Sequence, residues 1–225
     1  MPDFAQHGAV TTLHDLGVSQ ESLEAILNAA SPDYGIGLVL PVTADDMRAE
    51  AFRRIVDELA HVRFLKSIVV VLNRAPAKSD YLEAAEQTRV LGEAAEILWT
   101  DGPRVSSLID ELCYEGFNVT TPGKGRAVWM AFGYLLADVE LKAFVLHDCD
   151  IVDYRREMLA RLCLPMAHPS LDFDFCKAYY ARCTDRMHGR VVRLLVSPIL
   201  QALTTVLGYE EFVSFLSSFR YPLAG

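Results

Sequence analysis

Two aspartates separated by one residue follow a short apolar run in the second half of the chain. The run, residues 143–146, is too short for a helix and predicts a buried strand. Alternate side chains of a strand share a face, so Asp148 and Asp150 should converge where this strand ends. Two carboxylates at close range favour a bound cation, and hard oxygen ligands suit Mg²⁺ or Mn²⁺ shared with substrate phosphates. The alternative is an ordinary turn or a helix N-cap after the strand.

A second candidate segment is the sequence Thr-Pro-Gly-Lys-Gly-Arg over residues 121–126, just before an expected helix at 126–137. Glycines allow close backbone approach, and a helix N-terminus with Lys124 beside it offers hydrogen-bond donors and positive potential to a phosphate. The segment has neither the Walker A spacing nor the G-x-G-x-x-G pattern of dinucleotide folds. An ordinary glycine loop with a solvated lysine is the alternative.

The elements that must position these residues alternate between strand-like and helix-like segments. Strands are predicted at residues 37–42, 67–72, 97–100 and 143–146, and helices at 45–62, 80–95, 103–114 and 126–137. Asp45 and Asp46 stand where the N-cap of the first helix belongs. This order predicts an α/β fold, a doubly wound and mostly parallel sheet with helices on both faces. Ligands bind such sheets outside the carboxyl ends of the strands, where Asn73 and Arg74 also fall.

Beyond Asp150 the pattern changes. A helix is expected at residues 153–164, a turn at 168–170, a strand at 173–180, a loop at 187–190 and a buried helix at 191–207. A chain of 225 residues suits one compact domain.

Composition excludes some classes of protein. The net charge of −9 argues against binding to nucleic acid. We find no secretory signal sequence and no apolar stretch of the roughly 18–20 residues that a membrane span needs. Five cysteines without a C-x-x-C pair indicate reduced thiols and a cytoplasmic protein. Among them, Cys149 should face away from the two aspartates and fill the core.

Several stretches together resemble a known family. They are residues 40–46, 123–125, 148–150, 175–180 and 189–191, with further similarity at 7–14 and 222–225. The set is similar to the retaining glucosyl-3-phosphoglycerate and mannosyl-3-phosphoglycerate synthases. These are glycosyltransferases of the GT-A class, in which a D-x-D motif holds a nucleotide-sugar diphosphate through a divalent metal. The resemblance covers nearly the whole chain.

The resemblance implies one GT-A domain over residues 1–225, made of an N-terminal extension (1–34), a nucleotide-binding half (35–150) and the start of an acceptor half (151–225). It implies transfer of a hexose, with UDP-glucose favoured as donor, to phosphoglycerate or a similar small hydroxy acid. The residues implied to bind the nucleotide sugar are Pro41, Val42, Thr43, Asp45, Asn73, Lys124, Asp148 and Asp150. Asp150 and Asp148 would bind the metal, Gly189 and Arg190 the acceptor, and Asp150 and Arg190 are the implied catalytic residues.

Some positions depart from the family pattern. Val192 stands where the family has a threonine near Arg190, and the segment that normally supplies a metal-binding histidine lies beyond residue 225. His147 should point away from Asp148 and is expected to be structural. The chain could therefore be a fragment, or a nucleotide-sugar-binding module without catalysis. A sugar nucleotidyltransferase on the same fold is disfavoured, because no glycine-rich basic signature follows the first strand. The oligomeric state, including a homodimer, is left open.

Overall fold

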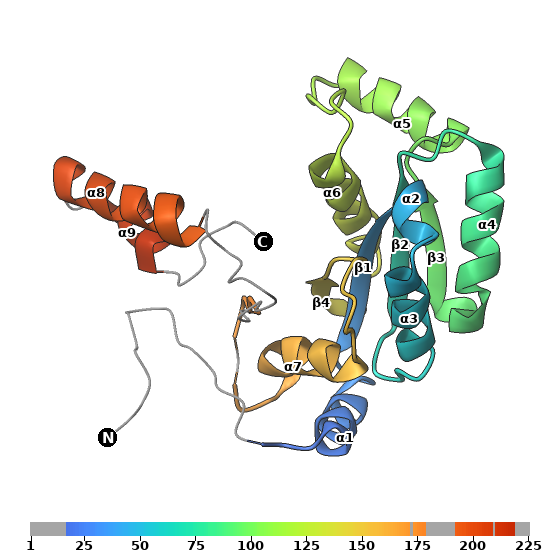
Figure 1. Cartoon of the computed structure of the whole chain (residues 1–225), viewed down its shortest axis with the longest axis horizontal. Helices are drawn as coiled ribbons and strands as arrows, with labels where there is room; N and C mark the ends of the chain where they lie inside the picture. Colours follow the sequence, from blue (N-terminus) through green and yellow to red (C-terminus); the bar gives the residue numbers. More distant parts are fainter. Residues whose placement is uncertain (1–16, 172, 179–191, 209, 219–225) are drawn as a thin grey trace. The chain divides into compact units, whose positions relative to one another are not determined.

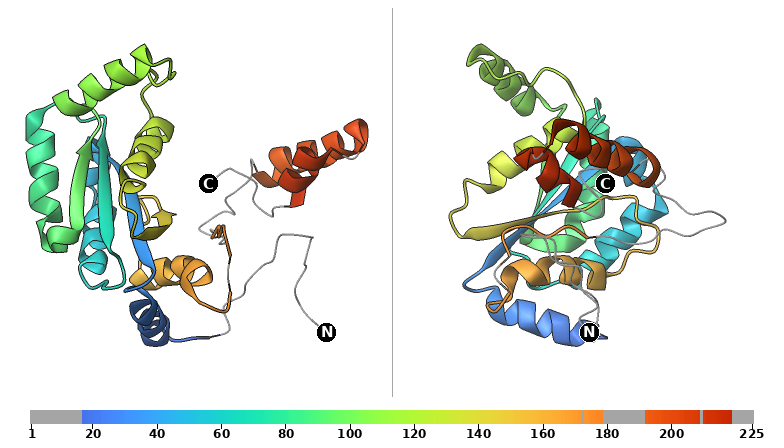
Figure 2. Two further views of the ribbon diagram at one scale, coloured as in Figure 1. Left: turned by 180° about the vertical axis from the view of Figure 1, so that it is seen from behind. Right: turned by 90° about the vertical axis from the view of Figure 1, so that its left-hand side faces the viewer.

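The computed structural model describes residues 17–171, 173–178, 192–208 and 210–218, and it divides the chain into two compact units. The larger unit spans residues 18–176, and the smaller combines residues 1–17 with 177–225. The larger unit contains a parallel sheet with helices on both faces (Figures 1 and 2), which confirms the predicted α/β class.

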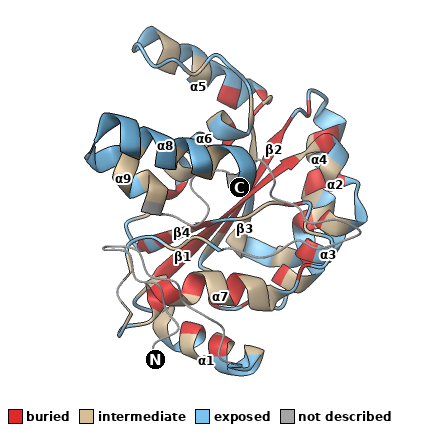
Figure 3. Cartoon of the chain, turned by 60° about the vertical axis from the view of Figure 1, so that its left-hand side comes forward, coloured by how far each residue is buried: buried red, intermediate tan, exposed pale blue. Residues whose placement is uncertain are grey.

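The sheet has four described strands, β1 (Gly35–Thr43), β2 (Ser67–Asn73), β3 (Ala95–Trp99) and β4 (Leu141–Leu146), in the order β3-β2-β1-β4. All neighbouring pairs are parallel. The two central strands, β1 and β2, are almost continuously apolar and buried, which is typical of strands covered on both faces (Figure 3). All four predicted strands of the sheet are confirmed, with bounds that differ by one or two residues.

The two faces of the sheet pack against different helices. Leu38, Leu40 and Val70 belong to a core that includes α3 (Glu50–Leu59) and α7 (Arg156–Ala167). Val39 and Val69 point to the other face, where they pack with α6 (Lys124–Leu135). The period of two along each strand thus divides one apolar sequence between two helical layers.

Two of the predicted helices are interrupted. The helix predicted at 45–62 is in fact α2 (Ala44–Met47) and α3, and Thr43, rather than Asp45 or Asp46, is the N-cap of α2. The helix predicted at 80–95 begins earlier as α4 (Lys78–Thr88) and continues as a 3₁₀ segment, η1 (Arg89–Ala94). Gly92 in that segment has a φ of 71°, a conformation that glycine adopts without a steric penalty and that ends the helix.

The helices before β4 agree with the sequence prediction, since α5 spans Pro103–Tyr114 and α6 is shifted by two residues. An additional helix, α1 (Gln20–Ala30), lies within the expected N-terminal extension. It packs beside α7 (Figures 1 and 2), where the Arg156 guanidinium donates to the Glu24 carboxylate at 2.7 Å.

The region after α7 differs from the sequence prediction. The predicted strand at 173–180 is wrong over residues 173–178, which form neither helix nor strand; the rest of it lies outside the described residues. In the smaller unit, the predicted helix at 191–207 is a π-helical turn, η2 (Val192–Val196), followed by α8 (Ser197–Leu207) and then α9 (Glu211–Ser218). No described residue of α8 is buried, so the expectation of a buried helix is wrong for this chain. α8 contacts α9 and η2, but these contacts leave all of its described side chains at least partly exposed.

Gly35 and Gly133 form a matched pair for testing the packing at the start of the sheet. A Cβ at Gly35 would lie 2.4 Å from the Glu140 carbonyl oxygen, whereas a Cβ at Gly133 would meet nothing within 4 Å. Gly35→Ala should therefore destabilise the fold by about 1–3 kcal/mol, because backbone must shift. Gly133→Ala, in the exposed interior of α6, should stabilise it by about 0.5–1 kcal/mol. Urea unfolding measures both; equal effects would contradict the tight approach of β1 to residue 140.

Candidate functional site

A pocket opens at the edge of the sheet where the parallel strands end. β1 lies between β2 and β4, so the connections to its two neighbouring strands run to opposite sides of the sheet. In doubly wound folds, ligands bind at such a switch point. The residues that line it come from the ends of β1, β2 and β4, from α2 and from the first turn of α6. They are Pro41, Val42, Thr43, Asp46, Asn73, Arg74, Lys124, Asp148, Cys149 and Asp150.

Both aspartates of the D-x-D motif line this pocket, in the turn that follows β4. Asp148 is half-buried and forms an ion pair with the Lys124 ammonium. Asp150 is exposed, and no hydrogen bond or ion pair to another described residue engages its carboxylate. The two carboxylates therefore differ: one is already neutralised by a lysine, and the other is open to a ligand.

The side chains of His147 and Cys149, the neighbours of the two aspartates, point into the fold. Cys149 is buried in the main core while it also contacts the pocket, and burial, with Asp46 and Asp150 adding, raises the pKa of its thiol to about 12. The His147 ring forms a hydrogen bond of 3.2 Å with the Tyr154 hydroxyl. Burial lowers the pKa of His147, because the charged imidazolium is poorly solvated inside the protein. Cys149 is thus a poor nucleophile, and the structural role expected for His147 agrees with its packing.

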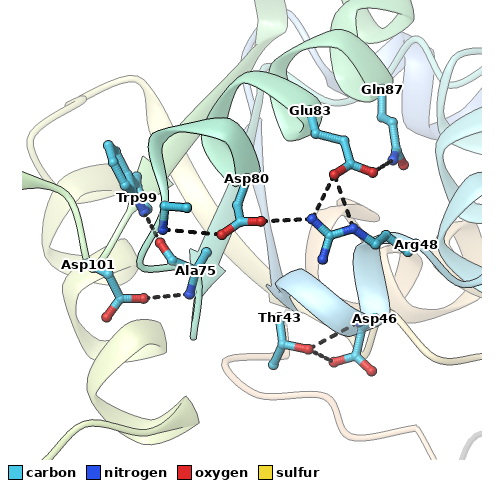
Figure 4. Close-up of polar contacts among 10 residues, drawn as sticks. Thr43, Asp46, Arg48, Ala75, Asp80, Glu83, Gln87, Trp99 and Asp101 are labelled. Atoms are coloured by element: carbon cyan, nitrogen blue, oxygen red, sulfur yellow. Dashed lines mark hydrogen bonds and ion pairs between the residues drawn. The ribbon is translucent and has the colours of Figure 1, made fainter.

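A side-chain hydrogen bond joins the ends of β1 and β2. The Asn73 side-chain amide, buried at the end of β2, donates to the Val42 carbonyl at 3.1 Å. The Thr43 hydroxyl caps α2: it accepts from the Asp46 backbone N–H at 3.1 Å and donates to the Asp46 carboxylate at 2.6 Å (Figure 4). The side chains of Asn73 and Thr43 are therefore committed to the architecture, and Pro41 and Val42 are buried.

Sequence reasoning assigned no ligand role to three residues that line the pocket, Asp46, Arg74 and Cys149, although it placed Arg74 at the end of a strand. Asp45, which was selected, is exposed on α2 and is not among the lining residues. The spacing Thr43-x-x-Asp46 is a capping pattern that could have indicated which aspartate folds back toward the strand end. Arg74 has a φ of 51°, and nothing in the sequence signals such a conformation for an arginine.

The first turn of α6 completes the pocket opposite Asp148. Its N-cap, Gly123, has no side chain to bond the first backbone N–H groups, and Lys124 follows at once. The loop before it is held by the Arg126 guanidinium, which donates to the carbonyls of Val119 and Thr120 at 3.2 and 3.3 Å. A helix N-terminus with an adjacent ammonium suits an anionic group such as a phosphate.

The donor set fits a divalent cation that is shared with a ligand. Among the residues that the structure describes, no group of three His, Cys, Asp or Glu side chains could hold a metal ion. Mg²⁺ and Mn²⁺ commonly use one or two carboxylates together with water and substrate phosphates, so Asp150 and Asp148 are sufficient protein ligands for such a site. Gly189 and Arg190 lie outside the described residues, and their acceptor role stays a prediction.

Comparison with solved structures confirms the expected GT-A fold. One neighbour is the glucosyl-3-phosphoglycerate synthase of Mycobacterium tuberculosis in complex with Mn²⁺, UDP and glucosyl-3-phosphoglycerate; the match has a TM-score of 0.54 at 22% identity and covers 88% of this chain and 58% of that one. The same enzyme with Mn²⁺, UDP and phosphoglyceric acid matches with a TM-score of 0.55 at 20% identity, over 95% of this chain and 60% of that one.

Comparison with curated sequences confirms the resemblance to glucosyl-3-phosphoglycerate synthases. The chain is 42% identical to the one from Persephonella marina over 226 residues, which is 100% of this chain and 56% of the relative. It is 33% identical to the one from Methanococcoides burtonii, over 99% of this chain and 55% of the relative. The chain thus spans about half the length of these relatives. No family model matches it.

The described cysteines, Cys113, Cys149, Cys163 and Cys176, form no disulfide with one another. In the part of the chain that the structure describes, no helix combines the length and apolar character needed to cross a membrane.

The raised pKa of Cys149 predicts low reactivity in the folded protein. A thiol with a pKa of about 12 carries roughly one ten-thousandth of its population as thiolate at pH 8, so iodoacetamide should leave it unmodified in metal-free buffer. Cys113, which is less buried, is the internal control and should be modified first. Peptide mass spectrometry after timed labelling measures both, and labelling of Cys149 should rise only as the pH approaches 11–12 or after unfolding. Equal labelling of the two at pH 8 would contradict the buried position of Cys149.

Proposed function

We propose that this chain is the nucleotide-sugar-binding part of a retaining hexosyltransferase that moves glucose from UDP-glucose to phosphoglycerate or a similar small hydroxy acid with the help of Mg²⁺ or Mn²⁺. The observation that carries the proposal is the D-x-D pair facing Lys124 across a pocket at the switch point of the sheet. Homology to glucosyl-3-phosphoglycerate synthases, and neighbours solved with Mn²⁺ and UDP, support the choice of donor and metal.

The chain's own residues would work mainly by placing and neutralising the diphosphate. Asp150 and Asp148 would hold the metal, which supplies Lewis-acid stabilisation of the leaving group. Lys124 and the uncapped N–H groups of α6 would bind the phosphate oxygens from the opposite side. When phosphate arrives, the Lys124 ammonium can exchange its partner from Asp148 to the ligand, which leaves the Asp148 carboxylate for the metal or the sugar.

The transfer step requires no nucleophile from the described residues. The bond between the anomeric carbon and the diphosphate oxygen breaks, the acceptor hydroxyl forms the new glycosidic bond on the same face, and its proton passes to the departing phosphate oxygen. Cys149 is excluded as a covalent catalyst by its raised pKa. The protein's contribution is then orientation and electrostatic stabilisation, with Arg190 as the proposed fork for the acceptor's carboxylate or phosphate.

Binding without catalysis is the second candidate function. The observation that favours it is the coverage, since the chain spans about half the length of the glucosyl-3-phosphoglycerate synthases that it matches. The two candidates share the nucleotide site and differ in turnover. Incubation with UDP-glucose, 3-phosphoglycerate and Mn²⁺, followed by NMR of the anomeric proton, decides between them: an α-glucoside product supports the retaining transferase, and UDP-glucose binding without product supports the module.

Replacement of Asp150 tests the metal-dependent part of nucleotide binding. The unaltered chain should bind UDP-glucose more tightly with Mn²⁺ than with EDTA, and Asp150→Asn should abolish that difference because it removes the open carboxylate. In EDTA the variant should bind at least as well as the unaltered chain, since one negative charge near the phosphates is gone. Isothermal titration calorimetry measures both. Asp110→Asn, an equal charge change on the exposed face of α5, is the control and should change neither value.

Replacement of Lys124 should affect nucleotide binding in a different way from replacement of Asp150. Lys124→Met removes a direct phosphate contact, so it should weaken UDP binding about tenfold whether or not Mn²⁺ is present. Calorimetry with UDP in both buffers separates this pattern from a metal-dependent one. Binding that is lost only with Mn²⁺, or a variant as tight as the unaltered chain, would remove Lys124 from the phosphate site. Failure of the unaltered chain to bind either UDP-glucose or GDP-mannose at millimolar concentration would overturn the proposed function.

A further inference from the structure

Arg74 has an unusual backbone conformation at the carboxyl end of β2. Among the described residues it is the one non-glycine residue with a positive φ, at 51°. Arginine has no side-chain group that favours this region, unlike asparagine or aspartate, so the conformation is unfavourable by itself. Such outliers persist where the surrounding structure determines them, and they concentrate at ligand sites.

The structure holds the residues on both sides of Arg74. On one side, the Asn73 side chain is bonded to the Val42 carbonyl at 3.1 Å. On the other, the Ala75 N–H donates to the Asp101 carboxylate at 2.8 Å and the Ala75 carbonyl accepts from the Trp99 indole at 2.6 Å (Figure 4). Three side chains from β2, β3 and the turn after β3 therefore fix the turn in which Arg74 lies.

The Trp99 indole is itself fixed. It stacks on Tyr81 of α4 with ring centroids 5.4 Å apart, and Gly102 approaches so closely that a Cβ there would lie 2.6 Å from the indole ring. The turn that contains Arg74 is therefore supported by the stacked rings of Trp99 and Tyr81. This arrangement orients the Arg74 backbone before any ligand arrives.

The side chain of Arg74 is available to a ligand. It lines the pocket and is exposed. The other lining cation, Lys124, is paired with Asp148, and the nearby Arg48 is paired with Asp80 and Glu83 at 2.7 Å each (Figure 4). In the described part of the chain, no carboxylate lies within ion-pair distance of Arg74.

The strand order decides which end of a nucleotide Arg74 would meet. Lys124 and Asp150 mark the diphosphate end beside β4, and β2 lies on the far side of β1 from β4. Neighbouring strands are about 4.8 Å apart, so the two ends of the pocket are separated by roughly 10 Å. That is about the span of a nucleoside diphosphate, so the base, rather than the phosphates, would lie at Arg74.

The chemistry of a guanidinium suits a keto base. Arginine offers a planar set of donors and no acceptor, so it can donate to the O4 carbonyl of uracil but not to the amino group that occupies the same position in cytosine. We infer that Arg74 is a base-recognition residue that donates to the O4 carbonyl of the uracil ring and selects UDP over CDP. This inference rests on the proposed nucleotide function and adds a specificity-determining contact to it.

Arg74→Gly is the sharpest test, because glycine accepts the positive φ and removes only the side chain. The variant should melt at the same temperature as the unaltered chain or above it. Its dissociation constant for UDP should rise about tenfold, its preference for UDP over CDP should disappear, and its affinity for inorganic pyrophosphate with Mn²⁺ should stay unchanged. Arg74→Lys should keep part of the preference for UDP, because an ammonium still donates to O4 although it lacks the planar guanidinium. Arg89→Ala, which removes a charge outside the pocket, is the control.

Other outcomes overturn the inference. Equal losses for UDP and pyrophosphate would place Arg74 at the phosphates, and unchanged UDP binding would remove it from the site. A UDP preference that survives in Arg74→Gly would assign base selection to other residues. No UDP binding by the unaltered chain would overturn the proposed function and this inference together, whereas unchanged binding by Arg74→Gly alone would overturn only the inference.

Discussion

Pro41 in the central strand limits how far the sheet can extend toward the pocket. β1 pairs with β2 to the end, through Pro41↔Val71 and Thr43↔Asn73, but its pairing with β4 stops at Val39↔Leu146. A proline has no N–H to donate and is tolerated where a ladder has ended. Because β4 stops short of the end of β1, the four residues after Leu146 run beside the last residues of β1, and the D-x-D motif enters the pocket instead of the sheet.

This opening explains how an acidic chain can be expected to bind an anionic ligand. The net charge of −9 opposes it at long range. Within the pocket, three carboxylates face two cations and an uncapped helix N-terminus. Lys124 is neutralised by Asp148, so phosphate binding would exchange the lysine's partner and leave the Asp148 carboxylate to a metal ion. Asp150 is open to a metal, and Arg74 is open at the far end.

Much of this arrangement was predictable from the sequence, for identifiable reasons. The continuous apolar runs of β1 and β2 and the helical spacing around Phe52 specify elements of a doubly wound fold, and that fold brings the strand ends together. Asp148, Asp150 and Lys124 were predictable because each follows or precedes such an element directly. The prediction for Cys149 was partly right, because its side chain is buried as expected but also contacts the pocket.

The remaining features depend on tertiary contacts that no local pattern encodes. Asp46 replaces Asp45 in the pocket because the N-cap of α2 is Thr43, two residues before Asp45. Arg74 is held at a positive φ by Trp99 and Asp101, which are distant in sequence. Residues 173–178 have the composition of a strand, but their backbone does not join the sheet. Propensity describes what a segment could form, while pairing partners decide what it does form.

The central claim is that the pocket between the ends of β1 and β4 holds a metal-bound nucleotide diphosphate. A crystal structure of the chain with Mn²⁺ and UDP, recorded with anomalous scattering from manganese, tests it most directly. The account predicts one strong anomalous peak at about 2.1–2.2 Å from an Asp150 carboxylate oxygen, bridged to the diphosphate, with Lys124 turned from Asp148 to a phosphate and the uracil ring beside Arg74. A peak remote from Asp150, or a nucleotide bound outside this pocket, would contradict it.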